Sequence, residues 1–134
     1  MSNRDISFDH VHLISKDVPA TAQWYVDKFG ADVVKRAEVR GAPQVYLEIG
    51  DGSMLIVRGE RPGETTTDKS GNEWGVDHFG LHVKGDFLAF CAGLKAKGVV
   101  FSAEPRDNGP TTQLAFINAP DGVSVELLCR KDRA

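Results

Sequence analysis

Asp9-His10-Val11-His12-Leu13, near the start of the chain, shares the pattern Asp-His-x-x-Leu with a later stretch, Asp77-His78-Phe79-Gly80-Leu81. Two further landmarks keep nearly the same separation. Gly30 and Gly98 are as far apart in sequence as Asp9 and Asp77, and the turns Asp51-Gly52 and Asp121-Gly122 are only slightly further apart. Since a spacing held almost constant at three places is hard to produce by chance, the sequence predicts two copies of one structural unit.

Each copy has the pattern of a strand, a helix and three further strands. The first unit predicts strands at 8–15, 31–37, 44–49 and 53–58, a helix between Asp17 and Gly30, and turns at 41–43 and 51–52. The second predicts strands at 78–83, 99–103, 112–118 and 123–129, and a helix at 86–97 that ends at Gly98. We therefore expect a single α+β domain over 1–134, with module one at about 8–58 and module two at about 76–130. Its two tandem βαβββ modules would form a curved mixed sheet around a concave site, with the helices outside.

The segment between the modules, 59–75, is rich in Gly, Thr and charged residues and lacks periodicity. A stretch of this length without a pattern is either a linker or a functional lid.

Composition limits the classes of function. The chain has 134 residues, 41% hydrophobic and 26% charged, with a formal net charge of −3, which argues against a nucleic-acid or membrane surface. The two cysteines form no Cys-x-x-Cys motif, and no apolar run has the length of a signal peptide or a membrane span. We expect a cytoplasmic protein whose partner is a small molecule.

Alternation along the strands predicts which face carries chemistry. One face of the first, fifth and last predicted strands is apolar and suited to packing against helices. The opposite faces carry all four histidines and one carboxylate: His10, His12, His78, His82 and Glu126.

Glu126 is the most informative of these residues. A lone carboxylate between Val125 and Leu127 is costly to bury unless it is paired or bound to a metal. Two imidazoles and one carboxylate suit a divalent transition metal with open positions. The offset between the two Asp-Gly turns places Ile56 at the matching position of the first unit, so the site would have three protein ligands.

The repeated modules, together with His10, His78 and Glu126 in their motifs, resemble the vicinal oxygen chelate superfamily, which includes glyoxalase I, extradiol dioxygenases, bleomycin- and fosfomycin-resistance proteins and methylmalonyl-CoA epimerase. The resemblance implies that these three residues bind the metal: Fe(II) first, with Mn(II), Zn(II) or Ni(II) as alternatives. Ile56 departs from the carboxylate of glyoxalase I-like members and fits the two-histidine, one-carboxylate site of extradiol dioxygenases better. In this family the modules either close one cleft within a chain or complete each other's sites between two chains, and we expect a homodimer.

Other residues of this face are open to two interpretations. His12 and His82 are candidates for proton transfer, and are equally consistent with structural roles. Glu48 is a further ligand or base, or an exposed strand carboxylate. Arg58 and Arg61 hold an anionic substrate group or are simply solvated.

The predicted function is a metal-dependent enzyme that chelates two neighbouring oxygens of its substrate, most similar to an extradiol-type dioxygenase. The alternatives are a metal-free protein that binds or sequesters a small molecule, and a metal-dependent isomerase or lyase. The sequence contains no glycine-rich dinucleotide loop and no nucleophile elbow, which excludes dinucleotide-dependent and serine-hydrolase chemistry of those types.

Overall fold

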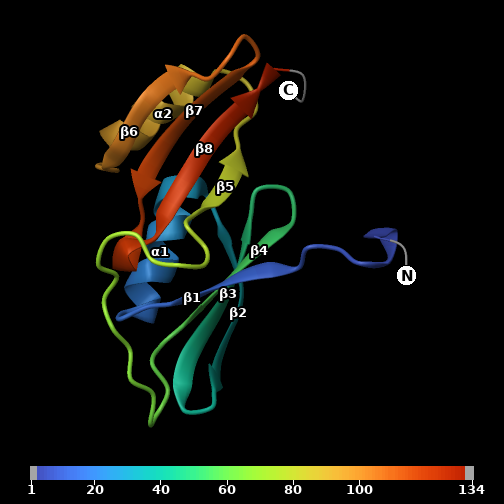
Figure 1. Ribbon diagram of the computed structural model, residues 1–134. Coiled ribbons are helices and arrows are strands. Elements are labelled where there is room, and N and C mark those ends of the chain that lie inside the picture. Colours follow the sequence, from blue (N-terminus) through green and yellow to red (C-terminus); the bar gives the residue numbers. More distant parts are fainter. Residues whose placement is uncertain (1–2, 132–134) are drawn as a thin grey trace. The chain divides into compact units, whose positions relative to one another are not determined.

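The computed structural model describes residues 3–131, and its elements follow the predicted order twice (Figure 1). The first set is β1 (His10–Ile14), α1 (Val18–Phe29), β2 (Asp32–Val39), β3 (Ala42–Ile49) and β4 (Ser53–Arg58). The second is β5 (Phe79–His82), α2 (Phe87–Ala96), β6 (Phe101–Asp107), β7 (Thr112–Asn118) and β8 (Ser124–Arg130). Two short 3₁₀ turns, η1 (Asn3–Asp5) and η2 (Pro120–Gly122), complete the described secondary structure.

The chain divides into two compact units, 1–67 and 68–134, and the boundary falls within the segment predicted to connect the modules. Each unit has one four-stranded sheet, with the order β1-β4-β3-β2 in the first and β5-β8-β7-β6 in the second. In both sheets the first strand pairs in parallel with the last, and the other pairs are antiparallel. The identical topology confirms the fold class and the repeat of two βαβββ modules.

Both helices begin and end at the predicted signals. The Asp17 side chain accepts a hydrogen bond from the Ala20 amide at 3.1 Å, and Gly30 ends α1 with a φ of 67° that favours glycine. In α2, Asp86 accepts from the Ala89 amide at 3.0 Å. Matched capping shows that each helix is defined by its local sequence.

The predicted alternation is confirmed on β8, where Val125, Leu127 and Cys129 are buried and the residues between them are half-buried. On β1 and β5 the predicted apolar residues are only half-buried. The buried face of the first sheet comes instead from β3 and β4: Val45, Leu47, Ile49, Leu55 and Val57. α1 packs against β2, β3 and β4 of its own unit. The core on this side holds each sheet in a fixed register, so the residues of the opposite face have defined neighbours.

Most strand boundaries lie within two residues of the prediction, and two differences change the description of a turn or a strand. The turn expected at 41–43 is wrong, because Arg40 and Gly41 form it with φ values of 52° and 81°, and β3 already begins at Ala42. Two successive positive φ values are typical of a two-residue hairpin turn, whose twist matches the right-handed twist of the flanking strands. This turn sets the register between β2 and β3. In the second unit the strand expected at 99–103 lies at Phe101–Asp107 instead.

Over residues 3–131, no helix has both the length and the apolar character needed to cross a membrane. The cytoplasmic location stays a prediction.

Candidate metal centre

The second unit brings His78 and Glu126 together. Gly80 of β5 pairs with Glu126 of β8, so the Glu126 side chain lies diagonally across from His78, two residues before Gly80. His78 Nε2 lies 3.2 Å from Glu126 Oε1, and the two side chains are 29% and 20% exposed. Two residues 48 positions apart in sequence therefore form one polar pair on the face opposite the buried core.

Asp77 orients the imidazole of this pair. His78 Nδ1 lies 2.8 Å from Asp77 Oδ2, so Nδ1–H donates to the carboxylate and Nε2 is the nitrogen that faces Glu126. The hydrogen bond to Asp77 raises the pKa of His78, and the contact with Glu126 adds to this, while partial burial acts in the opposite direction. A histidine oriented by a carboxylate in this way is a common arrangement behind metal-bound imidazoles.

Gly80 and Phe116 shape the surroundings of the pair. Gly80 lies on the same face as His78 and Glu126, and a Cβ built there would come 3.5 Å from Leu128 Cδ2 and 3.9 Å from the Glu126 Cβ. A Cβ here would make ordinary van der Waals contacts, so Gly80 keeps only the room of one small side chain free beside Glu126. The Phe116 ring meets the His78 ring edge to face, with the ring centroids 5.0 Å apart and an interplanar angle of 88°.

The pair fits a divalent ion. Metal–nitrogen and metal–oxygen bonds of about 2.1 Å at a right angle place their donor atoms about 3 Å apart. The observed 3.2 Å between Nε2 and Oε1 matches that spacing. His78 and Glu126 could therefore bind neighbouring positions of one ion, with Asp77 behind the histidine.

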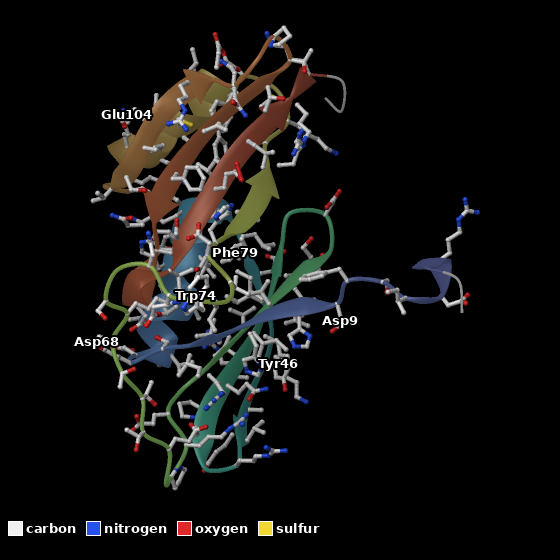
Figure 2. The ribbon with its side chains drawn as sticks, viewed as in Figure 1. Asp9, Tyr46, Asp68, Trp74, Phe79 and Glu104 are labelled. Atoms are coloured by element: carbon white, nitrogen blue, oxygen red, sulfur yellow. The ribbon has the colours of Figure 1, made fainter. Side chains whose placement is uncertain are left out.

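The first unit repeats the aspartate–histidine half of this arrangement. Asp9, labelled in Figure 2, directly precedes β1. His10 Nδ1 lies 2.7 Å from Asp9 Oδ2, and the His10 side chain is 36% exposed. The two Asp-His motifs thus have the same internal contact. Nε2 of His10 is the nitrogen left for another ligand or partner.

The first unit lacks the carboxylate. His12 pairs with Ile56 at the register position where Gly80 pairs with Glu126 in the second unit. Ile56 is buried with 9% exposure, and the His12 ring lies 5.8 Å from the His10 ring, centroid to centroid. Burial is the largest cause that lowers the pKa of His12, and the charges of Arg58, His10 and Arg61 act in the same direction.

His82 has a structural contact. The amide of Arg130 donates to His82 Nε2 at 3.1 Å, which leaves Nδ1 as the nitrogen that carries the proton. The proton-transfer roles of His12 and His82 stay predictions. Glu48 is exposed on β3, and Trp74 is fully exposed in the segment before β5 (Figure 2).

Within residues 3–131, no three His, Cys, Asp or Glu side chains form a group that could hold a metal ion. The structure thus pairs two of the three predicted metal ligands, His78 and Glu126, and positions His10 on its own unit with Asp9.

Three residues of the site, Asp77, Asp9 and Gly80, were not identified as functional from the sequence. The repeated Asp-His dipeptide was the signal for the two aspartates, because it recurs with the same spacing as the histidines. Gly80 could have been found by comparing the units, since it replaces His12 at the position beside the carboxylate strand.

Comparison with known proteins agrees with this architecture. The sequence pattern of the Glyoxalase/Bleomycin resistance protein/Dioxygenase superfamily matches residues 7–127. A curated relative, the probable lactoylglutathione lyase of Vibrio cholerae, is 30% identical over 135 aligned positions that cover 98% of this chain and 94% of the relative.

Solved structures show the same fold. A glyoxylase/bleomycin resistance protein/dioxygenase domain from Frankia sp. EAN1pec superposes with a TM-score of 0.79 at 16% identity, covering 96% of this chain and 95% of the other. The fosfomycin resistance protein FosX from Listeria monocytogenes, in complex with Mn(II) and sulfate, has a TM-score of 0.66 at 17% identity, covering 92% and 91%.

Proposed function

Because this chain belongs to the Glyoxalase/Bleomycin resistance protein/Dioxygenase superfamily, we propose that it is a divalent-metal-dependent enzyme that acts on a small molecule with two neighbouring oxygen atoms. The observation that carries the proposal is the His78–Glu126 pair at 3.2 Å, with Asp77 on the other ring nitrogen of His78. The carboxylate of Asp77 fixes which ring nitrogen faces Glu126, as second carboxylates do behind metal-bound histidines.

His78 and Glu126 are two of the proposed protein ligands, and His10 is the third. The repeat supports His10, because its contact with Asp9 copies the contact of His78 with Asp77. Ile56 supplies no donor atom, so the proposed ligand set has two histidines and one carboxylate. Of the candidate ions, Fe(II) suits this set best, and Mn(II), Zn(II) and Ni(II) bind the same donor types.

A bound divalent ion would act as a Lewis acid toward the two substrate oxygens. Asp77 holds the Nδ1 proton of His78 and thereby keeps Nε2 directed to Glu126. Gly80 leaves room for a ligand above the carboxylate. His12 is the proposed proton acceptor or donor, because its pKa is lowered and it therefore carries a free ring nitrogen at neutral pH.

Two reaction types remain within this proposal. Three protein ligands favour the extradiol-type dioxygenase, since more positions stay open for substrate and dioxygen. The similarity to the probable lactoylglutathione lyase of V. cholerae favours an isomerase or lyase. A metal-free binding protein is the competing class, and the homodimer stays a prediction.

Elemental analysis of anaerobically purified protein tests the proposal. We expect about one iron or manganese per chain in the wild type, and loss of that metal in His10→Ala and in Glu126→Gln. His12→Ala is the matched control, because it removes an imidazole from the same strand without removing a proposed ligand. A wild type that takes up no divalent ion after incubation with iron, manganese, zinc or nickel contradicts the proposal and favours the binding protein.

Substrate assays on the loaded protein then separate the reaction types. Oxygen consumption with catechols indicates the dioxygenase, while turnover of lactoylglutathione without oxygen consumption indicates the lyase.

A further inference from the structure

Arg58, at the end of β4 in the first unit, holds a carboxylate with both arms of its guanidinium group. Nη1 donates to Glu64 Oε1 at 2.7 Å and Nη2 donates to Glu64 Oε2 at 3.1 Å. Nη1 also donates to the Gly59 carbonyl at 3.1 Å, and the Arg58 side chain is only 12% exposed. This two-point geometry is the one with which arginine recognises carboxylates.

The carboxylate comes from the segment that follows the strand. Glu64 accepts a further hydrogen bond from the Arg61 amide at 2.6 Å, and the Glu64 amide donates to the Arg61 carbonyl at 3.1 Å. The side chain of Glu64 is 34% exposed, almost three times as much as that of Arg58. The positively charged partner is therefore fixed in the sheet, while the carboxylate reaches it from a surface turn.

Gln44 gives an independent sign that this place is built to bind something else. Gln44 pairs with Arg58 across β3 and β4, lies on the same face and is 5% exposed. Its Nε2 donates to the Tyr46 hydroxyl at 2.7 Å, whereas among the described atoms its Oε1 has no hydrogen-bond partner. A buried polar atom without a partner destabilises the fold, so it is expected where a ligand supplies the missing bond.

Arg61, whose backbone contacts Glu64, has a second polar atom of this kind. Over the described residues, its Nε is buried and has no hydrogen-bond partner. The carboxylate of Glu64 thus satisfies Arg58 but leaves one donor of Arg61 and one polar atom of Gln44 unused.

This cluster lies on the same face of the first sheet as the candidate histidines. His12 and His10 pair with Ile56 and Met54, which precede Arg58 by two and four residues on β4. With a rise of about 3.3 Å per residue, these positions lie about 7 and 13 Å from Arg58 along the strand. A small molecule could reach from the guanidinium group to either imidazole.

We propose that Arg58 binds a carboxylate group of the substrate, and that Glu64 occupies this place in the free protein as an internal substitute. The incoming carboxylate exchanges with that of Glu64 on the same two N–H donors, and the side chains of Gln44 and Tyr46 stand beside it. This inference rests on the proposed function only in assigning the bound carboxylate to the substrate. The substrate class is then a carboxylic acid that also carries two neighbouring oxygens.

Benzoate binding to the metal-free protein tests the exchange. The probe is sodium benzoate, titrated at constant ionic strength into isotopically labelled protein while the Arg58 Nε–Hε signal is followed by NMR, with sodium chloride as the control anion. Glu64→Gln removes the competing charge and keeps the shape of the side chain. Glu60→Gln is the matched control, because it makes the same charge change in the same segment at an exposed residue.

We expect Glu64→Gln to bind benzoate about tenfold more tightly than the wild type, because the Glu64 carboxylate no longer competes for the N–H donors of Arg58. A change of this size corresponds to about one charge-assisted hydrogen bond. Glu60→Gln should match the wild type. In the Glu64→Gln background, Arg58→Gln should abolish binding, and Arg58→Lys should retain only weak binding because it loses the two-point geometry.

Equal affinities in Glu64→Gln and Glu60→Gln would overturn the inference, as would benzoate binding that survives Arg58→Gln. Urea unfolding shows whether each variant folds. If Glu64→Gln does not fold, the inference is tested on the wild type. Benzoate must then shift the Arg58 Nε–Hε signal, and sodium chloride must not. Metal content is measured separately and should be normal in Glu64→Gln, so failure of the carboxylate site and failure of the metal site give different results.

Discussion

The two units share one topology and differ at a pair of facing residues beside the repeated Asp-His motif. In both, a histidine at the start of the first strand or directly before it contacts the aspartate that precedes it. The distance from histidine Nδ1 to aspartate Oδ2 is 2.7 Å in the first unit and 2.8 Å in the second. At the next position on that face, the first unit pairs His12 with Ile56, and the second pairs Gly80 with Glu126. One unit thus places an imidazole beside an apolar residue, and the other places a glycine beside a carboxylate.

Because of this difference, the two units carry different chemical groups on the same fold. The second unit combines a histidine with a carboxylate at a distance that suits one metal ion, whereas the first unit has His10 and His12 on this face and Ile56 in place of the carboxylate. The first unit also has a cationic group on this face, because Arg58 follows Ile56 by two residues on β4, where Leu128 follows Glu126 on β8. The backbone is the same in both, so the chemistry is set by a few side chains on one face of each sheet.

The largest expected effect comes from removing the carboxylate that only the second unit has. Glu126→Gln keeps the size of the side chain but removes the charged oxygen donor, so we expect metal affinity to fall at least about 100-fold. Competition with a chelator and elemental analysis measure this. Glu48→Gln, an exposed change on the other sheet, is the control, and unchanged metal affinity in Glu126→Gln would contradict the assignment.

Converting the first unit into a copy of the second tests the facing pair directly. Ile56→Glu alone should lower the free energy of unfolding by about 3 kcal/mol, because it places a carboxylate at a buried position opposite an imidazole. Adding His12→Gly should recover part of that loss by opening space above the new carboxylate. Urea unfolding of metal-free protein compares the two variants, and equal destabilisation would show that the glycine has no such role.

The aspartates behind the histidines should matter next. Asp77→Asn keeps the shape but weakens the orientation of His78, and we expect metal affinity to fall about tenfold. Asp9→Asn should have a similar effect if His10 is the third ligand. Chelator competition measures both variants, and a loss in Asp77→Asn together with no change in Asp9→Asn would limit the metal site to the second unit.

The helix ends should respond alike in both units. Gly30 and Gly98 have φ values of 67° and 84°, and neither has an atom within 4 Å of an added Cβ. Alanine at either position should therefore cost about 1 kcal/mol of unfolding free energy through backbone strain alone. Thermal or urea unfolding measures this, and a clearly larger loss at one glycine would show that the two helix ends are not equivalent.

The smallest effect concerns the pH dependence of the Arg58–Glu64 pair. The hydrogen bonds from Arg58 and the Arg61 amide lower the pKa of Glu64 to about 2 from its usual 4.5. A lowered pKa in the folded protein adds stability above pH 4.5, and that stability is lost as the pH falls from 4.5 toward 2. The stability difference between the wild type and Glu64→Gln should therefore shrink across this range. An equal difference at pH 7 and pH 3 would contradict the pairing.

Much of the fold was predictable because its signals are local. Asp17 and Gly30 were expected to begin and end a helix, and they do so. The turn at Arg40 and Gly41 was missed, since Arg40 is not a residue that usually adopts a positive φ and Pro43 suggested a turn further on.

The candidate site residues had two kinds of signal in the sequence. His10 and His78 repeat at a fixed separation, and Glu126 is a lone carboxylate between apolar residues of one strand. Gln44 and Glu64 have no such signal. Gln44 is important because of the strand beside it, and Glu64 because the turn that carries it folds back onto Arg58. Strand pairing and the path of a turn cannot be recognised from a local sequence pattern.

The two modules, their order of elements and the polar face of each strand follow from the amino-acid sequence alone, because alternation and capping act over a few neighbouring residues. Three contacts became known only from the folded chain: His78 Nε2 meets Glu126 Oε1, His82 accepts the Arg130 amide, and Glu64 fills the guanidinium fork of Arg58. These contacts join atoms whose distances are set by strand register and by the path of a loop, and both are fixed only when the core of each sheet packs.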